Sequence, residues 1–550
     1  MARTRSVGLR RSRMTALAVA VAVGAGGVGL ANWASADGTF PYRATYAGGV
    51  TSAAPDQGAA ESELRSSYAN WKRLYVTGDG AGGNRRVVSR TGCAGEGQAD
   101  TVSEAQGYGA VISMYMNDRE TFDALWRYTK SKLNSRGLMG WCVRPDGSFE
   151  GGVGGGASAT DGDTDIAWGL VFADKLWGSG GSVDYAAEAR SMIKAIRAHS
   201  IQDDTFMLTG GDTQKHHVNT NPSYWDPAIY RVFAQFSGDD SWNRVAQVTY
   251  DIAGKIQNHD NGTGLVPEDS TIDGTKAGNY SYDFGYNAVR YPWRIVKDYL
   301  WHGTSQARTN VDRLNAFWKS QGGLQNAVDG YTITGAKTGK WRGAALTSMA
   351  AAGYMTGTDT TAARSAYDLN VKTVDGDSWG YYGNSLRMLS LLMMTGNMPN
   401  LYAGQGGTGG DGGSSGGGDV RSGSKALQVS PTGSWKSTTQ FPGVAQDTQY
   451  RATIHVKGSG RVQLRAHAGV WGAELGETNC EATGSWQACS LTFSSGSNGQ
   501  VTFRVTDPAA GGSVSIDDAS LTPAAGGNDV LSNGGFESKD GWSVENPFSL

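Results

Sequence analysis

The sequence has few cysteines, few prolines and almost no net charge. Only 4 Cys and 13 Pro occur among 550 residues, and 48 basic against 51 acidic residues leave a formal charge of −3. A near-neutral chain lacks the basic surface that nucleic-acid binding needs, so we expect no nucleic-acid partner. The cysteines have no histidines at zinc-ligand spacing, which argues against a structural zinc site.

Long apolar runs are also missing, except for one near the N-terminus. Five arginines precede the apolar stretch 14–30, and Ala34-Ser35-Ala36 has the A-x-A form of a cleavage site. This pattern predicts a signal peptide over residues 1–36 and a secreted protein whose mature chain begins at Asp37. No other segment is apolar enough to span a bilayer, so we expect no membrane partner.

An even number of cysteines in an exported chain favours disulfides. The sequence predicts two of them, Cys93 with Cys142 and Cys480 with Cys489. Free buried thiols are the alternative, and they are more typical of the reducing cytosol.

The length of the chain exceeds one ordinary core and predicts more than one domain. Apolar residues recur near helical spacing from Ser62 onward, which indicates an all-α domain over residues 37–403. Residues 404–418 are mostly glycine and form a predicted linker. Short strand-like runs follow at 450–456, 461–466, 486–493, 500–505 and 512–520, and they predict a β-sandwich over 419–550.

The tail of the chain has an unusual order. Its segment from Leu531 to Glu537, followed by Trp542, resembles the opening strand of a carbohydrate-binding module of jelly-roll type, whereas 420–427 resembles a position past that strand. Either a second module is cut short, or residues 528–550 complete the first one as a circular permutation. We favour the second, because an orphan strand would leave an apolar edge exposed. The same resemblance implies a structural calcium ion near Asp518 and Glu537.

An acidic run, Thr160-Asp161-Gly162-Asp163-Thr164-Asp165, precedes an apolar helix predicted from Ile166 to Trp177. Acids at alternate positions cannot share one helix face, so we expect a loop in which Thr160, Asp161 or Asp163 caps the helix. A calcium loop of the EF-hand type would need Gly and Glu where Ile166 and Phe172 stand.

Five segments together resemble glycoside hydrolase family 8. They are the acidic run and the segments 103–109, 221–224, 290–294 and 381–387, which occur in the family's order. The resemblance implies an (α/α)6 barrel and an inverting endo-glycosidase that acts on β-1,4-linked polysaccharide. It implies no required cofactor, and we expect a monomer.

Inverting hydrolysis needs one carboxylic acid to protonate the leaving oxygen and one carboxylate to activate water. Glu104 matches the family's proton donor, although on spacing alone it would be a first-turn helix residue stabilised by the dipole. Asp161 matches an aspartate that binds and distorts the sugar. Further candidates for substrate binding are Tyr108, Trp168, Tyr224, Asn287, Arg290 and Arg294, of which the two arginines are expected to position carboxylates.

The base position departs from the common family pattern. Asn287 stands where the family usually has the base aspartate, and a neutral amide cannot take a proton from water. Asp283 is our candidate for the base, with capping of a helix as its alternative role. Glu268 and Asp269 are less favoured.

The sequence therefore predicts a secreted enzyme that cleaves cellulose or mixed-linkage β-glucan. Chitosan and xylan are the alternative substrates within the family. Loop acids such as Asp269 and Asp283 would attract a cationic polymer, so chitosan is not excluded. A polysaccharide-binding protein with impaired catalysis is the alternative from another class, and Asn287 is the residue that motivates it.

Overall fold

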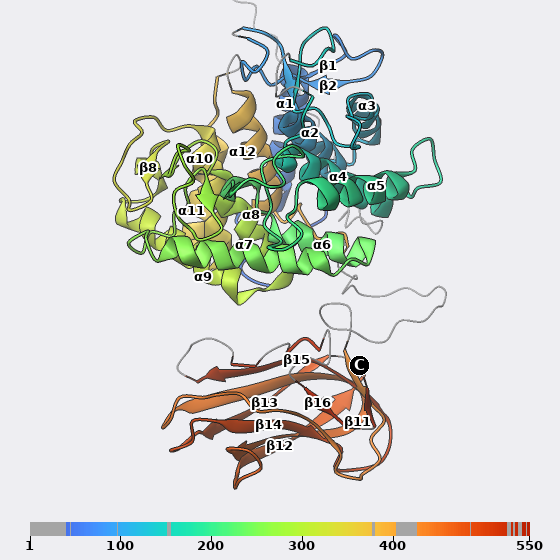
Figure 1. Cartoon of the computed structure of the whole chain (residues 1–550), viewed down its shortest axis with the longest axis vertical. Coiled ribbons are helices and arrows are strands. Elements are labelled where there is room, and N and C mark those ends of the chain that lie inside the picture. The colour runs from blue at the N-terminus through green and yellow to red at the C-terminus, as the bar shows by residue number, and fades with distance from the viewer. Residues whose placement is uncertain are drawn as a thin grey trace, which may run out of the picture.

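The computed structural model describes residues 40–402 and 426–549, except 45, 96, 151–155, 377–379, 485, 525–529, 532–533, 537–541 and 546. The predicted signal peptide, the predicted linker and Glu537 lie outside the described residues. The described chain forms a helical unit and a β-rich unit (Figure 1).

Residues 40–402 contain, in their described part, two concentric rings of α-helices. The inner ring consists of α2 (Ser103–Tyr115), α4 (Thr160–Trp177), α6 (Pro227–Ser237), α8 (Arg290–His302), α10 (Ala344–Ala352) and α12 (Tyr381–Met394). The outer ring consists of α1 (Gln57–Tyr75), α3 (Arg119–Lys130), α5 (Tyr185–His199), α7 (Ser241–Gln257), α9 (Ser305–Ser320) and α11 (Thr360–Lys372).

Burial separates the two rings. Residues of α2, α4, α10 and α12 are buried on almost every side, as expected of helices without a polar face. The outer helices bury only one stripe, for example four residues of α1. Each inner helix contacts the next, and α12 returns to α2, so that the inner ring closes. This is the predicted (α/α)6 barrel.

Short antiparallel strand pairs and 3-10 turns join the helices. The pairs are β1 (Val76–Thr77) with β2 (Arg86–Val87), β3 (Thr101–Val102) with β4 (Cys142–Val143), β5 (Asn219–Thr220) with β6 (Ser270–Thr271), and β7 (Asp283–Phe284) with β8 (Tyr331–Thr332). The 3-10 turns are η1 (Pro222–Tyr224), η2 (Leu324–Asn326) and η3 (Gly353–Thr356). Across the described residues, no helix is both long and apolar enough to cross a bilayer.

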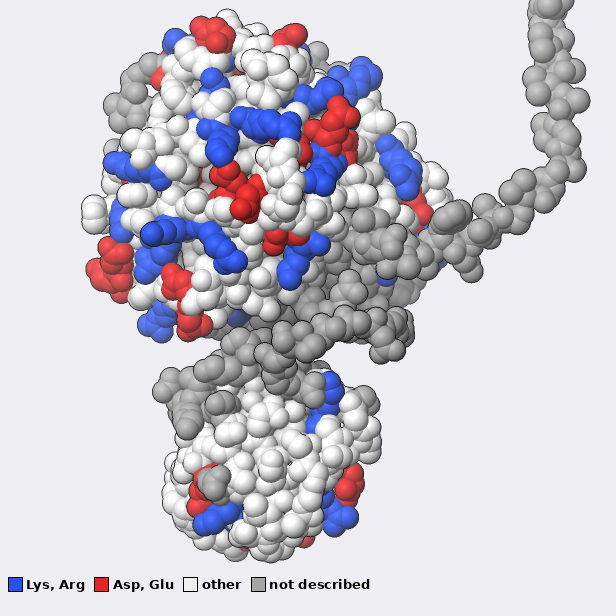
Figure 2. Space-filling model, turned by 90° about the vertical axis from the view of Figure 1, so that its right-hand side faces the viewer, with Lys and Arg blue, Asp and Glu red and all other residues white. Residues whose placement is uncertain are grey.

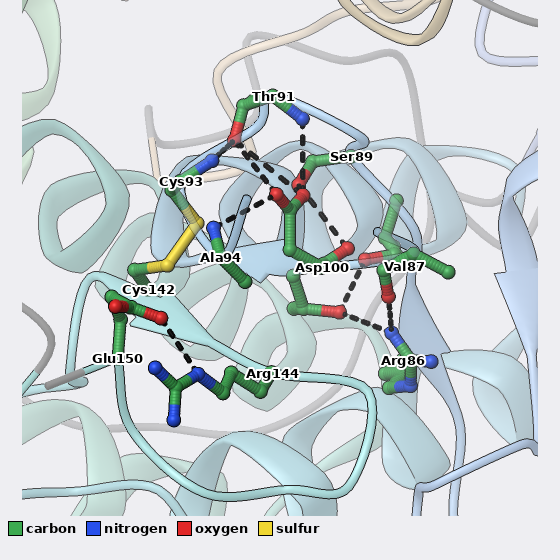
Figure 3. The surroundings of a disulfide bond; sticks show 12 residues. Arg86, Val87, Ser89, Thr91, Cys93, Ala94, Asp100, Cys142, Arg144 and Glu150 are labelled. Carbon is green, nitrogen blue, oxygen red and sulfur yellow. Dashed lines mark hydrogen bonds and ion pairs between the residues drawn. A yellow bond between two sulfur atoms is a disulfide. The ribbon is translucent and has the colours of Figure 1, made fainter. Parts of the chain in front are cut away.

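A disulfide joins Cys93 to Cys142 close to the start of α2 (Figure 3). It ties the loop after β2 to β4, whose Cys142 pairs with Val102 of β3. Asp100 organises the same loop, because its carboxylate accepts hydrogen bonds from Ser89 Oγ at 2.5 Å and from the Thr91 N–H at 3.0 Å. The second disulfide joins Cys480 to Cys489, so both predicted pairings are confirmed.

The β-rich unit is built on one long strand, β11 (Gln449–Ala468). Its first half pairs with β13 (Gln487–Ser494) and β15 (Ser513–Pro523), and its second half pairs with β12 (Glu474–Thr483) and β14 (Val501–Thr506). The smaller strands are β9 (Leu427–Val429), β10 (Ser437–Gln440), β16 (Ser543–Val544) and β17 (Phe548–Ser549). Side chains from both halves of β11 share one apolar core.

The end of the chain pairs with strands from the beginning of this unit. β16 pairs with β10, and β17 pairs with β9, both antiparallel. Phe536, Trp542 and Phe548 are buried in the common core. Tail residues therefore supply core side chains as well as strands.

Candidate active site

Glu104 lies in the first turn of α2. Its Oε2 accepts a hydrogen bond from Nη1 of Arg290 at 2.6 Å, and its Oε1 accepts one from the Tyr381 hydroxyl at 2.9 Å. The side chain keeps 18% of its surface exposed. Both partners start other inner helices, α8 and α12, so closure of the barrel fixes the position of this carboxylate.

Arg290 connects the residues of the site. Its Nη1 also lies 2.5 Å from Oδ2 of Asp161, and its Nη2 donates a hydrogen bond to Ser223 Oγ at 2.8 Å. The guanidinium carbon lies 5.2 Å from the ring centre of Tyr224. One buried cation therefore joins α2, α4, α8 and η1, and losing any anionic partner would leave its charge poorly compensated.

The acidic run lies inside α4, which begins at Thr160 and not at the predicted Ile166. The loop-and-cap prediction was wrong because it assumed that acids within one helix must share one face, whereas this inner helix is buried on almost every side. All three carboxylates are buried and have partners on neighbouring elements. Asp163, for example, accepts a hydrogen bond from the Met139 N–H at 2.9 Å. Burial raises the pKa of Asp163 to about 8, so this side chain is largely protonated at neutral pH.

Two of these aspartates have the same spacing along their helix as the two arginines that they bind. Asp161 and Asp165 are four residues apart on α4, and Arg290 and Arg294 are four residues apart on α8. Residues at this spacing share one helix face. Asp161 meets Arg290, and both oxygens of Asp165 lie 2.9 Å from the guanidinium nitrogens of Arg294.

Two glycines allow α2 and α4 to approach closely. A Cβ on Gly162 would lie 2.5 Å from the carbonyl carbon of Ser103 and 2.7 Å from the N of Glu104. A Cβ on Gly107 would lie 2.8 Å from Cβ of Asp165. No side chain larger than hydrogen fits between these backbones. The glycines thus set the spacing at which Glu104 and Asp161 reach the same arginine.

Burial is the main reason why the pKa of Glu104 is raised to about 7. The negative charge of Asp161 adds to this rise, while Arg290 and the Tyr381 hydroxyl oppose it. A carboxyl group with this pKa carries its proton over part of the neutral range, as a general acid must.

Trp168 and Arg294 lie beneath the site in the centre of the barrel, where only 1% of each is exposed. Trp168 packs against Lys297, whose Nζ lies 3.7 Å from the ring centre. Arg294 binds Asp165 and also Asp226, at 2.7 Å. Trp168 presents no surface to a sugar, so its expected contact with substrate is corrected to a supporting role. Arg294 positions carboxylates, as expected of the two arginines. Tyr108 is equally buried, and its hydroxyl takes a hydrogen bond from Arg290 at 3.3 Å.

The segment before α8 contains the residues considered for the base. Asn287 is exposed, and its backbone N–H donates to Oε1 of Glu268 at 3.2 Å. Gly285 makes room for Glu268, because a Cβ there would lie 2.7 Å from Oε1. Glu268 is thus held against the backbone of this segment.

Asp269 extends toward a different part of the site. Its Oδ1 accepts a hydrogen bond from Asn219 Nδ2 at 2.8 Å, and Asn219 lies on β5, directly before η1. Burial raises the pKa of Asp269 to about 6. Burial is the main reason why the pKa of Tyr224 is raised, and the charges of Asp161, Glu104 and Asp269 add to this rise. The charges of all three acids therefore act on the same phenol and raise its pKa.

Asp283 is in β7 and caps no helix. It lines a pocket of about 440 Å³ with His259, Lys276 and Thr332, among others. Within the described chain, its carboxylate has no hydrogen bond or ion pair, and the next residue, Phe284, is buried against Trp318. Its assignment as base stays a prediction.

Sequence reasoning gave no role to Tyr381 and Ser223, which hold Glu104 and Arg290. Both residues lie within segments that carried the family resemblance, and this was the available signal. No group of three or more His, Cys, Asp or Glu in the described part of the chain could hold a metal ion. Among the described residues Asp518 therefore belongs to no such group. Glu537 is not described, and the calcium ion stays a prediction.

The helical unit is similar to known proteins. The family model described as "Glycosyl hydrolases family 8" matches residues 39–396. Endoglucanase A of Acetivibrio thermocellus is 42% identical over 370 residues, which cover 67% of this chain and 76% of the relative. A reducing end xylose-releasing exo-oligoxylanase of Halalkalibacterium halodurans is more distant, at 24% identity over 55% of this chain and 81% of its own.

A solved structure with this fold is an apo beta-1,3-1,4-glucanase from Paenibacillus sp. X4. It aligns with a TM-score of 0.60 at 28% identity and covers 66% of this chain and 99% of its own. The aligned share of this chain is close to the length of its helical unit.

Proposed function

This chain belongs to glycosyl hydrolase family 8, an inverting family, and from that premise we propose that it is an endo-acting hydrolase of β-1,4-linked glucan. The observation that carries the proposal is Glu104, which is partly exposed, held by Arg290 and Tyr381, and has a pKa of about 7. In this role Glu104 protonates the glycosidic oxygen as the bond to the anomeric carbon breaks. Asp161, fixed by the same arginine, binds the distorted sugar.

Asp269 is the residue to which we assign the base. Its carboxylate is held by Asn219 beside the segment that leads to Tyr224, and its charge acts on the Tyr224 phenol as those of Asp161 and Glu104 do. A pKa of about 6 leaves it ionised at neutral pH while keeping it basic enough to accept a proton from water. Glu268 then positions the segment around Asn287 through the backbone, and Asp283 is the alternative base.

Three separate variants test this assignment: Asp269→Asn, Glu268→Gln and Asp283→Asn. Loss of a general base lowers kcat by about 10²–10⁴-fold, and we expect this only for Asp269→Asn. Azide is already anionic and needs no base, so it should restore turnover in that variant by forming a glycosyl azide. A large loss of kcat in Asp283→Asn with azide rescue, and none in Asp269→Asn, would transfer the role to Asp283.

Glucan is the proposed substrate because two relatives are named for glucan cleavage and the xylose-releasing relative is more distant. Release of reducing sugar from cellulose, mixed-linkage β-glucan, chitosan and xylan would rank the substrates. We expect the highest kcat/KM on one of the two glucans, together with a rapid fall in viscosity from internal cleavage. Higher kcat/KM on chitosan or xylan would replace the substrate and leave the catalytic residues unchanged.

A second candidate function is polysaccharide binding without hydrolysis, which Asn287 favours because it replaces the usual base. Wild-type protein that is retained on glucan but releases no sugar from any of the four polymers would establish it.

The proposed secretion is tested by determining the N-terminus of exported protein, which should be Asp37. Sedimentation would test the proposed monomer.

A further inference from the structure

Charged side chains occur in two different environments in the helical unit. Figure 2 shows basic and acidic side chains mixed on its surface, where water and salt weaken their attraction. A second set is largely buried among the inner helices, where charges interact more strongly. We call this set the axial cluster, and its members are Glu104, Asp161, Asp165, Asp226, Arg290, Arg294 and Lys297.

Lys297 is a fully buried cation of this cluster. Its Nζ lies 2.6 Å from Oδ2 of Asp226, and neither side chain has any exposed surface. Nζ also lies 3.7 Å, 4.5 Å and 5.5 Å from the ring centres of Trp168, Trp293 and Trp301. The carboxylate and the three rings offset part of the cost of keeping an ammonium group away from water. Burial lowers the pKa of Lys297 to about 8, so the side chain stays largely charged at neutral pH.

Asp226 and Asp165 share one guanidinium group. Nη1 of Arg294 lies 2.7 Å from Oδ2 of Asp226 and 2.9 Å from Oδ1 of Asp165, and Nη2 lies 2.9 Å from Oδ2 of Asp165. The oxygen of Asp226 that Arg294 contacts is also the one that Lys297 binds. Without the lysine, the full charge of Asp226 would attract the guanidinium away from Asp165. Lys297 therefore leaves Arg294 to bind Asp165 with both terminal nitrogens.

The charges of the axial cluster balance. Its three cations belong to α8 and face three aspartates, of which two belong to α4 and one caps α6. The cluster is therefore neutral while Glu104 carries its proton, and it has one excess negative charge when Glu104 is ionised. An uncompensated buried charge is costly, which agrees with the raised pKa of Glu104.

Other titratable groups face the cluster from the surrounding helices. Burial raises the pKa of the phenols there far above the neutral range, and these are Tyr108, Tyr115, Tyr224, Tyr230, Tyr381 and Tyr382. Burial lowers the pKa of His302, on α8, to about 4. Asp298 of the same helix is paired with Arg231. Asp163 has a pKa of about 8, and its ionisation is common to the wild type and the variants described below.

We propose that Lys297 is a positioning residue for hydrolysis, which neutralises Asp226 and so leaves Arg294 to hold α4 and balances the buried charge around Glu104. Glu104 is the general acid in the proposed function, on which this role of Lys297 rests. Lys297 follows Arg290 by seven residues, which is about 10 Å along α8. At this distance, and with an effective dielectric constant of about 20, one charge changes a neighbouring pKa by about one pH unit.

The profile of kcat/KM against pH tests this role, measured on the polymer that the wild type cleaves fastest. In Lys297→Met the cluster loses one positive charge, so Glu104 holds its proton more tightly and the alkaline limb should move up by about one pH unit. Lys297→Arg keeps the charge, and its limb should stay at the wild-type position. Lys297→Met/Asp226→Asn removes one charge of each sign and should return the limb to the wild-type position.

Arg313→Met is the matched control. Arg313 lies on α9, outside the axial cluster, and pairs at 3.0 Å with Asp260, another carboxylate without exposed surface. Its alkaline limb should not move. A limb of Lys297→Met that coincides with that of Arg313→Met overturns the role of Lys297. A limb that stays displaced in the double variant also overturns it, because removal of an aspartate cannot replace a lysine that only fills space.

Folding of the variants gives a second test. If Lys297→Met does not fold, the double variant decides. A folded double variant with the wild-type limb supports the role, since Asp226 then no longer needs a cation. A double variant that also fails to fold overturns it, since the protein then needs the packing of the lysine and not its charge.

The proposed function fails in a different way. Wild-type protein that releases no sugar from cellulose, mixed-linkage β-glucan, chitosan or xylan would contradict it. Infrared difference titration would then still follow the carboxyl band of Glu104, which is identified by its absence in Glu104→Gln. The midpoint of this band should be about one pH unit higher in Lys297→Met than in the wild type. Equal midpoints would overturn the role of Lys297 whether or not the protein cleaves glucan.

Discussion

The Tyr381 hydroxyl donates a hydrogen bond to Oε1 of Glu104 over 2.9 Å. This bond connects the first turn of α12 to the first turn of α2, where the inner ring closes. It stabilises the ionised carboxylate and so lowers the pKa of Glu104, against the larger effect of burial. Tyr381 therefore adjusts the pH at which Glu104 loses its proton.

Replacing Tyr381 with Phe should move the alkaline limb of the pH–rate profile to higher pH. Without the hydroxyl, the ionised form of Glu104 is less stable, its pKa rises, and the acid keeps its proton to higher pH. The profile of kcat/KM against pH measures this pKa in the free enzyme. Tyr354→Phe is a control, because Tyr354 lies in η3 and makes no contact with Glu104. An alkaline limb that stays in place or moves to lower pH would contradict the role given to Tyr381.

Glu104→Gln should lower kcat by about 10²–10⁴-fold, because an amide cannot deliver the proton that the leaving oxygen needs. The KM for glucan should change much less, since the side chain keeps its size. Glu120→Gln is a matched control: Glu120 also lies in the first turn of a helix, α3, but its side chain is 85% exposed. Equal activity of the two variants would mean that Glu104 is only a first-turn residue stabilised by the helix dipole and is not the general acid.

The wild-type enzyme should have a bell-shaped profile of kcat/KM against pH. Glu104 must be protonated and has a pKa of about 7, so the rate falls as the pH rises through that value. Asp269 must be ionised and has a pKa of about 6, so the rate also falls as the pH drops below it. The optimum should lie between these values. A rate that stays constant from pH 5 to about pH 8 would show that neither group titrates in the rate-determining step.

Much of the site could be predicted from local sequence because its residues occur in short segments. Glu104, Asp161 and Arg290 each belong to such a segment, and the structure brings all three together. The bond between Tyr381 and Glu104 spans 277 residues and depends on closure of the ring, which no local pattern contains. Trp168 was misjudged for a related reason: α4 is an inner helix and buries nearly every side.

The strands of the β-rich unit were also only partly predictable. The sequence predicts two separate strands, 450–456 and 461–466, because glycines lie between them. In the structure both belong to β11, and Gly458 and Gly460 adopt φ of 114° and 121° within it. Pairing with β12 and β15 continues through these glycines and overrides their tendency to end a strand.

The two disulfides should differ in their effect on stability. Cys93 and Cys142 are 49 residues apart, whereas Cys480 and Cys489 are 9 apart. A longer closed loop restricts the unfolded chain more, and chain entropy makes the difference about 1.5 kcal/mol. Denaturant unfolding of the Cys93→Ser/Cys142→Ser variant should show the greater loss in free energy of unfolding, compared with Cys480→Ser/Cys489→Ser. A greater loss for the second pair would mean that native contacts, and not loop closure, determine the effect.

Gly162→Ala should reduce both stability and activity. The added Cβ would meet the backbone of Ser103 and Glu104, which cannot move aside as a flexible side chain can, so α2 and α4 must separate. Overpacking of this kind costs about 1–3 kcal/mol. Because Glu104 and Asp161 then no longer fit the same guanidinium, kcat should fall by more than the loss of folded protein explains.

Gly254→Ala is the matched control for this steric argument. Gly254 lies within α7, and a Cβ there would meet nothing within 4 Å. Alanine is a better helix former than glycine, so this variant should gain about 0.5–1 kcal/mol with unchanged kcat. Thermal unfolding and kcat of both variants distinguish the explanations. If Gly162→Ala is as stable and as active as Gly254→Ala, then the spacing of α2 and α4 does not depend on the missing side chain.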